Sequence, residues 1–230
     1  GTPVPAVIGT DYRALERMLS KKTDLSVLTV NTDGMELYDK GEEKAYLALF
    51  EKFSDKNEES EDMNDKDRPH IGIIGMTPQD VSDLKAADKM RELFQQKYDQ
   101  QAVCYGMGDG LDEVRNASLA AKNVVVSPAA LKAAQYLQKK FGTPYEIAYP
   151  LASELVPEVN YQGKKILIVQ QQVIANAVRK EIEKRTARTP AGDRRFYSKR
   201  TESQRGRNRS GGRLVYDEER TSGGRRCISP

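Results

Sequence analysis

Short apolar runs alternate with amphipathic stretches along the first 185 residues. Each run is rich in β-branched residues and too short to form a helix. The runs are Val4–Ile8, Val27–Val30, Ile71–Ile74, Ala102–Tyr105, Val124–Val126, Ile147–Tyr149 and Ile166–Val169. Runs of this kind, separated by helical segments, are typical of buried parallel strands. The pattern therefore predicts an α/β fold built on a parallel sheet.

The amphipathic stretches place apolar side chains at helical spacing. They predict helices over residues 11–21, 41–53, 80–98, 128–140 and 173–184. In the fourth of these, Ser127 is a suitable N-cap and Pro128 suits the first helical position, where a missing N–H costs nothing. Gly142 and Pro144 are typical of the end of a helix. We expect these helices to cover the sheet.

An acidic stretch interrupts the alternation in the middle of the chain. Residues 54–69 hold seven acidic and three basic residues with one large apolar side chain, which is typical of a linker. It separates residues 1–53, the end of a first βα domain, from a second βα domain over residues 70–162. Residues 163–185 begin a further βα unit. Because the chain opens Gly-Thr-Pro-Val-Pro and enters a predicted strand at once, we interpret it as a fragment of a longer polypeptide.

The alternation ends at residue 186. Residues 186–230 carry a net charge of +7 and include eleven arginines and six glycines, whereas residues 1–185 carry −4. This composition predicts a basic, low-complexity tail without stable structure. The abrupt change is also what an out-of-frame reading would produce, a hypothesis that the coding DNA decides. A native tail would make the chain a candidate phosphate or nucleic-acid binder, although few aromatic residues are available for stacking, so we expect no nucleic-acid partner.

Metal ligands are scarce in this sequence. Cys104 lies in an apolar run, Cys227 lies in the tail, and His70 is the only histidine. These residues are too few for a zinc or iron–sulfur site. We interpret Cys104 as a buried apolar residue and His70 as a surface residue. We therefore expect no metal to be held by this chain alone, and no catalytic residue can be named.

Neither a signal peptide nor a run of 18 apolar residues is present, so the sequence predicts a soluble cytoplasmic chain without membrane contact. Ligands of parallel sheets bind where strands end at their carboxyl side. Four predicted loops lie there: Gly9–Asp11, Asn31–Gly34 with the following Tyr38–Gly41, Gly75–Pro78 and Gly106–Gly110. The spacing of the last loop matches neither the dinucleotide-binding nor the P-loop motif, so an ordinary glycine turn is the favoured interpretation.

A series of short motifs runs through these loops in a fixed order. They are Ile8-Gly9-Thr10-Asp11, Val30-Asn31-Thr32-Asp33-Gly34-Met35, Tyr38-Asp39-Lys40-Gly41, Ile71-Gly72-Ile73-Ile74-Gly75, Met107-Gly108, Leu111-Asp112-Glu113-Val114, Ala121–Ser127, Lys140–Tyr145 and Gly163–Val169. The series covers about residues 3–185 and resembles the nitrogenase component 1 type oxidoreductases. That family includes the nitrogenase molybdenum–iron protein subunits, their scaffold relatives and the dark-operative reductases of chlorophyll synthesis.

The resemblance implies Rossmann-like domains around a metallocluster, a second subunit of the same family, and electron transfer from an ATP-dependent iron-protein reductase. The family's iron–sulfur thiolates lie upstream of the part represented in this chain. Two further departures are Ala133-Ala134-Gln135, where catalytic subunits supply a cofactor thiolate, and Glu42-Glu43, where they have a histidine. We therefore expect a nitrogenase-like relative without molybdenum-cofactor chemistry.

These observations lead to one leading hypothesis and two alternatives. The leading one is an oxidoreductase subunit that helps to enclose a metallocluster or substrate but is inactive alone. An iron–sulfur cluster or related metallocluster is expected only in the complete assembly. The alternatives are a non-catalytic scaffold or assembly subunit and the phosphate or nucleic-acid binder. The expected cofactor-binding residues are Tyr38, Gly41, Glu42, Gly106, Gly108 and Ser127.

Overall fold

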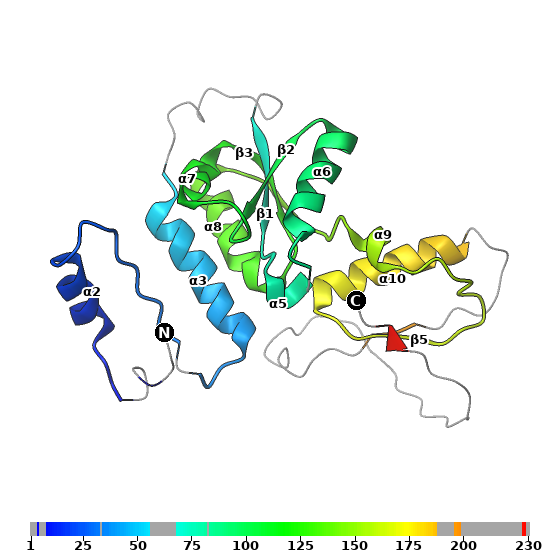
Figure 1. Cartoon of the computed structure of the whole chain (residues 1–230), viewed down its shortest axis with the longest axis horizontal. Helices are drawn as coiled ribbons and strands as arrows, with labels where there is room; N and C mark the ends of the chain where they lie inside the picture. Colours follow the sequence, from blue (N-terminus) through cyan, green and yellow to red (C-terminus); the bar gives the residue numbers. More distant parts are fainter. Residues whose placement is uncertain are drawn as a thin grey trace. The chain divides into compact units, whose positions relative to one another are not determined.

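The computed structural model describes Val4 and residues 8–32, 34–55, 68–81, 83–187, 196–198 and 227–228. Its contacts divide the chain into two compact units, Gly1–Leu151 and Ala152–Pro230 (Figure 1). Parallel strands and helices make up both units, which confirms the predicted α/β class. The predicted domain boundaries at residues 53, 69, 162 and 185 stay predictions. Most of the predicted linker lies outside the described residues.

Within the described residues of the first unit, four parallel strands form one sheet in the order β2-β1-β3-β4. The strands are β1 (His70–Ile74), β2 (Gln101–Tyr105), β3 (Ala120–Val125) and β4 (Tyr145–Ile147). They confirm four of the predicted runs, although β4 begins two residues earlier than its apolar run. Because β1 pairs with a strand on each side and is buried along its whole length, it is the centre of the core.

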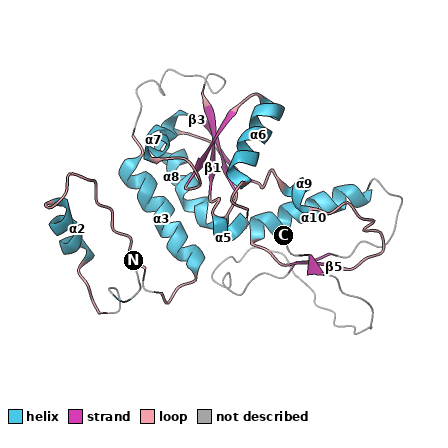
Figure 2. Cartoon of the chain, in the orientation of Figure 1, coloured by secondary structure: helices cyan, strands magenta, loops and turns pink. Residues whose placement is uncertain are grey.

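One face of this sheet is covered by α3 (Tyr38–Phe53), α7 (Leu111–Arg115) and α8 (Leu131–Phe141) (Figure 2). The main core cluster lies there and joins α3, the strands and α8. In it the ring of Phe50 meets the edge of Tyr105 at a centroid distance of 5.1 Å. Short 3₁₀ turns, η1 (Asn116–Leu119) and η2 (Pro128–Ala130), precede β3 and α8. Residues 38–53 are thus packed into the same core as the sheet.

The opposite face is covered by α6 (Ala86–Tyr98), which buries Ala87, Met90 and Phe94. The single helix predicted over residues 80–98 is wrong, because α5 (Pro78–Val81) and α6 are separate. Between them the carboxylate of Asp83 accepts a hydrogen bond from the backbone N–H of Lys85 at 2.9 Å. Such a local bond favours a turn over a continuous helix.

The predicted caps of α8 are confirmed. Ser127 Oγ accepts the backbone N–H of Ala129 at 3.4 Å, and Pro128 follows at the first position of η2. The helix ends at Phe141, where Gly142 has a φ of +76° in the left-handed region. The α-helix itself begins at Leu131, three residues after the predicted start, because the first turn is a 3₁₀ turn.

Of the two strands predicted before residue 38, the one over Val27–Val30 is wrong, and most of the other, Val4–Ile8, lies outside the described residues. Val4 is helical, Ile8 lies in a turn, and residues 27–30 have no regular structure. A strand needs a neighbour for its backbone groups, and here one of them bonds elsewhere, because the Lys52 ammonium donates to the Val27 carbonyl. The predicted helix is confirmed as α2 (Tyr12–Ser20), capped by Asp11, which accepts the Ala14 N–H at 2.9 Å. None of its residues is buried.

The second unit contains α9 (Ala152–Leu155), β5 (Ile166–Ile168), α10 (Gln172–Ala187), β6 (Phe196–Ser198) and β7 (Cys227–Ile228). Both short strands pair in parallel with β5, in the order β6-β5-β7. Five residues of the predicted tail therefore lie in described strands, and the prediction of no stable structure for the tail stays a prediction. The rest of residues 188–230 lies outside the described part.

Arg185 ties α10 to the segment around α9. Its guanidinium pairs with Glu181 at 3.0 Å and donates to the carbonyls of Val156 and Ser153, both at 2.8 Å. Along the described residues, no helix is long and apolar enough to cross a membrane.

Candidate functional site

The strand order β2-β1-β3-β4 places the topological switch point between the carboxyl ends of β1 and β3. Ligands of doubly wound sheets bind at this crevice. The loop after β1 begins with Gly75, whose φ is +91°. A Cβ built there would lie 2.7 Å from the Cβ of Ala130 and 2.9 Å from that of Ser127. Only glycine allows the two loops to pack this closely.

Helix α3 extends along this edge of the sheet. Its residues Tyr38, Glu42 and Tyr46 share one face, because residues four apart lie above one another on a helix. At one end the Tyr46 hydroxyl donates to the carbonyl of Tyr105 at 3.3 Å, where β2 ends. At the other end the Tyr38 hydroxyl donates to Asp80 Oδ1 at 2.8 Å, on α5. This face of α3 is therefore fixed against segments that follow β1 and β2.

Three carboxylates gather where α3 meets α5, and we call Asp39, Glu42 and Asp80 the carboxylate cluster. Asp80 is only 3% exposed. One oxygen of each residue, Asp39 Oδ1, Glu42 Oε2 and Asp80 Oδ2, is buried without a hydrogen-bond partner. Burying carboxylate oxygens without donors is costly, so such atoms are candidates for an interaction with a ligand or a proton.

The cluster changes the acidity of its members. Removal from water raises the pKa of the Glu42 carboxyl, and the charge of Asp80 raises it further, whereas the Thr77 hydroxyl opposes this rise. Burial also raises the pKa of the Tyr38 hydroxyl, with the hydrogen bond to Asp80 as the second cause. Burial and a neighbouring like charge both disfavour the ionised form of Glu42, and perturbed carboxyls of this kind are common at functional sites.

Glu43, the next residue, lies in a different environment. It is buried, and Oε1 pairs with Lys132 Nζ at 2.8 Å and with Lys40 Nζ at 3.5 Å. The two adjacent glutamates therefore differ, since Glu43 is neutralised by lysines and Glu42 is not.

The structure brings four of the six predicted binding residues to this edge of the sheet. Tyr38 and Glu42 lie on the shared face of α3, Ser127 packs on Gly75, and a Cβ at Gly106 would lie 2.9 Å from the Tyr46 hydroxyl oxygen. The other two turn elsewhere. Gly41 faces Thr32, and Gly108 faces the guanidinium of Arg91. The binding role of all six stays a prediction.

Asp80 and Tyr46 were not identified from the sequence, and Thr77 was included only as part of the candidate loop Gly75–Pro78. Tyr46 had a usable signal, because it continues the four-residue spacing of Tyr38 and Glu42. Asp80 had none. An acid in the first turn of a helix is ordinarily solvent-exposed and stabilises the helix dipole, so its burial under Tyr38 depends on the tertiary structure.

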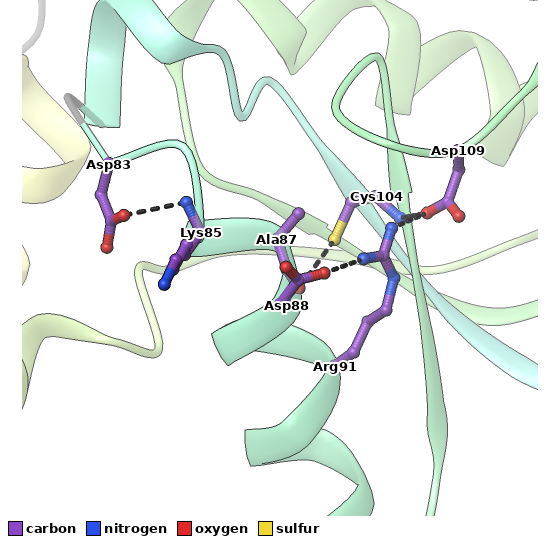
Figure 3. A network of polar contacts seen from close by, with 7 residues as sticks. All are labelled: Asp83, Lys85, Ala87, Asp88, Arg91, Cys104 and Asp109. Carbon is purple, nitrogen blue, oxygen red and sulfur yellow. Dashed lines mark hydrogen bonds and ion pairs between the residues drawn. The ribbon is translucent and has the colours of Figure 1, made fainter.

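A separate polar network holds the loop after β2 (Figure 3). Asp109 Oδ2 accepts the backbone N–H of Cys104 at 2.6 Å and the Arg91 guanidinium at 2.9 Å. Arg91 also donates to Asp88 at 2.8 Å. These contacts give the Gly106–Gly110 loop an ordinary structural role as a braced turn.

The metal-ligand chemistry of the described residues does not fit an iron–sulfur cluster, which needs thiolates. Cys104 is fully buried, and burial raises the pKa of its thiol to about 12. It is therefore a protonated apolar residue, as predicted. Among the described residues, no group of three or more histidine, cysteine or acidic side chains is placed to hold a metal ion.

The prediction that His70 is a surface residue is wrong. Its side chain is 8% exposed, and Nε2 lies 3.1 Å from the Tyr105 hydroxyl. Burial lowers the pKa of the imidazole. It lies at the amino end of β1, away from the carboxyl edge. Its burial follows from pairing with the strands on both sides of β1.

Comparison with known proteins identifies the family to which the chain is related. No curated protein matches it. A sequence model of the family described as nitrogenase component 1 type oxidoreductase matches residues 1–152, which is more than half of the chain and ends where the first unit ends. The match confirms the resemblance seen in the ordered motifs as far as residue 152. Because the family model matches more than half of the chain and the fold is built on a parallel sheet, the chain belongs to the nitrogenase component 1 type oxidoreductases.

Proposed function

We propose that this chain forms one wall of a substrate or metallocluster site in a nitrogenase component 1-like oxidoreductase. Electrons would come from an ATP-dependent iron-protein reductase. The family generally binds metalloclusters and works as a multi-subunit complex with a reductase partner. The observation that supports this wall is the polar face of α3, where the Tyr38 hydroxyl donates to Asp80 and buried oxygens of Glu42 and Asp80 have no hydrogen-bond partner.

The chain's own residues would bind and orient a ligand rather than hold a metal. The carboxylate oxygens of Glu42 and Asp80 accept hydrogen bonds and suit a ligand that donates them, whereas thiolates for an iron–sulfur cluster would come from outside the described residues. A cluster supplied by the assembly would serve as the electron carrier. Tyr46, tied to the end of β2, keeps the α3 face in register with the sheet.

Anaerobic mixing with an ATP-dependent iron-protein reductase tests this function. We expect the chain, co-expressed with a second family subunit, to form an MgATP-dependent complex with the reductase and to stimulate ATP hydrolysis. The chain purified alone should contain no bound iron, and stoichiometric iron with a visible absorption band would contradict that. Absence of any complex with the reductase would count against the electron-transfer role.

A non-catalytic scaffold is the second candidate, and one observation favours it. Helix α2 buries no residue and leaves Met18 51% and Leu19 40% exposed. An uncovered apolar stripe on an amphipathic helix is typical of a surface that packs on a partner. The scaffold predicts a stable complex with a second family subunit that forms without ATP and is lost in Met18→Glu/Leu19→Glu. The double variant Arg13→Glu/Arg17→Glu on the same helix is the matched control.

A further inference from the structure

The first residue of β1 is paired less regularly than the rest of the strand. His70 pairs with Ala120 of β3. The next residue of β1 pairs with Lys122, so the register between the two strands shifts by one residue at this point. A bulge of this kind disrupts the ladder of backbone hydrogen bonds locally. The start of β1 therefore depends more on side-chain contacts than residues 71–74 do.

Two side chains fix the segment that enters β1. The imidazole of His70 is buried, and its Nε2 lies 3.1 Å from the hydroxyl oxygen of Tyr105, which is fully buried in β2. Two residues before His70, the Arg68 guanidinium donates to the carbonyls of Ser118 and Ala120 at 2.6 and 3.5 Å, where β3 begins. These contacts tie residues 68–70 to the strands on both sides of β1.

The contact of His70 is sensitive to protonation. A neutral imidazole has one nitrogen that accepts a hydrogen bond, whereas both nitrogens of an imidazolium are donors. A proton added at Nε2 would therefore place a donor against the Tyr105 hydroxyl in place of an acceptor. It would also place a positive charge in a site that is withdrawn from water, which is costly without a directly paired anion. The buried position thus favours the neutral ring.

We propose that His70 is an acid-sensitive latch at the start of β1. At neutral pH its ring accepts the Tyr105 hydroxyl at Nε2 and holds residues 68–70 against the sheet. In mild acid, solvent transfers a proton to the lone pair of Nε2, and the charged ring leaves its buried site. Residues 68–70 then separate from the sheet at the bulge, while residues 71–74 stay paired. The latch lies at the amino end of the sheet and does not depend on the proposed oxidoreductase function.

The charged groups around His70 act in opposite directions. The carboxylates of Asp109, in the loop after β2, and of Glu113, on α7, favour the imidazolium. Burial has the larger effect and lowers the pKa of the ring. The positive charge of Arg68 also favours the neutral form, and β3 contributes the uncharged Ala120 at this position. The balance keeps the ring neutral at pH 7.

The latch gives the pH dependence of stability a definite direction. In the unfolded chain the imidazole has its ordinary pKa of 6.5 and binds a proton below that pH, whereas the buried ring stays neutral to lower pH. Unfolding therefore takes up a proton, and the free energy of unfolding falls as the pH drops below 6.5. The fall ends below the pKa of the folded state. Local opening of residues 68–70 follows the same rule, and its equilibrium constant rises by up to about tenfold per pH unit.

NMR titration of the full chain tests the latch directly, because the sequence contains a single histidine. With ¹⁵N-labelled histidine we expect a neutral ring at pH 7, with Nε2 unprotonated, and a titration midpoint below 6.5. Tyr105→Phe removes the donated hydrogen bond and keeps the aromatic ring, so it should raise the midpoint. The matched control is Tyr98→Phe, at a tyrosine that is half exposed, and it should leave the midpoint unchanged.

Hydrogen exchange locates the opening. As the pH drops from 7 to 5, the protection factors of the amides of residues 68 and 70 should fall by up to about tenfold per pH unit. Those of residues 72–74 should change much less. In His70→Gln, whose amide side chain takes up no proton in this range, the protection of residues 68 and 70 should not depend on pH.

Three results would overturn the latch: a wild-type midpoint at or above 6.5, a protonated Nε2 at pH 7, or the same pH dependence of protection in the wild type and in His70→Gln. An unchanged or lowered midpoint in Tyr105→Phe would equally contradict the hydrogen bond on which the latch depends. If His70→Gln does not fold, the wild-type titration and Tyr105→Phe decide the question, since both retain the histidine.

Discussion

Two similar apolar runs of the first unit differ in secondary structure and in burial. Val27–Val30 has no regular structure and is partly exposed, whereas Ile71–Ile74 lies in the fully buried β1. The second run has β2 and β3 on either side, whereas no described strand pairs with the first. An apolar run becomes a strand only when other strands complete its hydrogen bonds, so burial in this protein follows from neighbours rather than from the run itself.

Deleting a side chain of the buried core should have the largest effect on the free energy of unfolding, and deleting one from the part before α3 should have little effect. Phe50→Ala removes a fully buried ring that packs on Tyr105, so we expect a loss of about 3–5 kcal/mol in the free energy of unfolding. Leu19→Ala, on the unburied helix α2, should change it by less than about 0.5 kcal/mol. Urea denaturation followed by circular dichroism measures both. Equal losses would show that α2 is as much a part of the core as α3.

Adding a methyl group at the centre of β1 should have the next largest effect. A Cβ at Gly72 would lie 2.2 Å from Asn123 Oδ1 and 2.7 Å from the Tyr105 ring. Overpacking of this kind should cost about 3 kcal/mol in Gly72→Ala, because both neighbours are fully buried. The urea midpoint measures the loss. An unchanged midpoint would mean that the sheet accommodates the methyl group.

Removing the brace of the loop after β2 should cost less. Asp109→Ala leaves the Cys104 N–H and the Arg91 guanidinium without their shared acceptor, at a cost of about 1–2 kcal/mol. The control is Asp112→Ala, which removes an exposed pair with Arg115 and should cost less than about 0.5 kcal/mol. Thermal denaturation compares the two. A larger loss in the control would contradict the assignment of Asp109 as the brace.

The smallest effect should be a gain in stability. Gly41 lies inside α3, and a Cβ there would make an ordinary 3.5 Å contact with Thr32. Gly41→Ala should therefore stabilise the chain by about 0.5–1 kcal/mol, because alanine favours a helix interior over glycine. Denaturant midpoints measure the gain. A loss instead would show that the segment before α3 packs more tightly on the helix than its exposure indicates.

Much of the fold followed from sequence patterns that act locally. The apolar runs at Ile71, Ala102, Val124 and Ile166 are confirmed as strands, and the caps of α8 at Ser127 and Gly142 are confirmed as well. The run at Val27 matched the same pattern and is not a strand. A periodicity rule counts residues along the chain and contains no information on whether a pairing strand is available.

The candidate site was predictable only in part. Tyr38 and Glu42 were identified through the family motif and lie where a ligand site is expected. Asp80 was missed, because ordinary helix-start chemistry explains it without any burial. His70 was assigned to the surface for a similar reason. The sequence around it, which includes a proline, does not indicate that its side chain will contact the Tyr105 hydroxyl.

The amino-acid sequence by itself determined the succession of strands and helices, the α/β class and the family, since these depend on spacing and composition along the chain. Only the tertiary structure decided which apolar runs are buried and which carboxylates lose their water, because both depend on residues far apart in sequence. Glu42 and Asp80 are 38 positions apart, and their electrostatic interaction exists only where α3 meets α5.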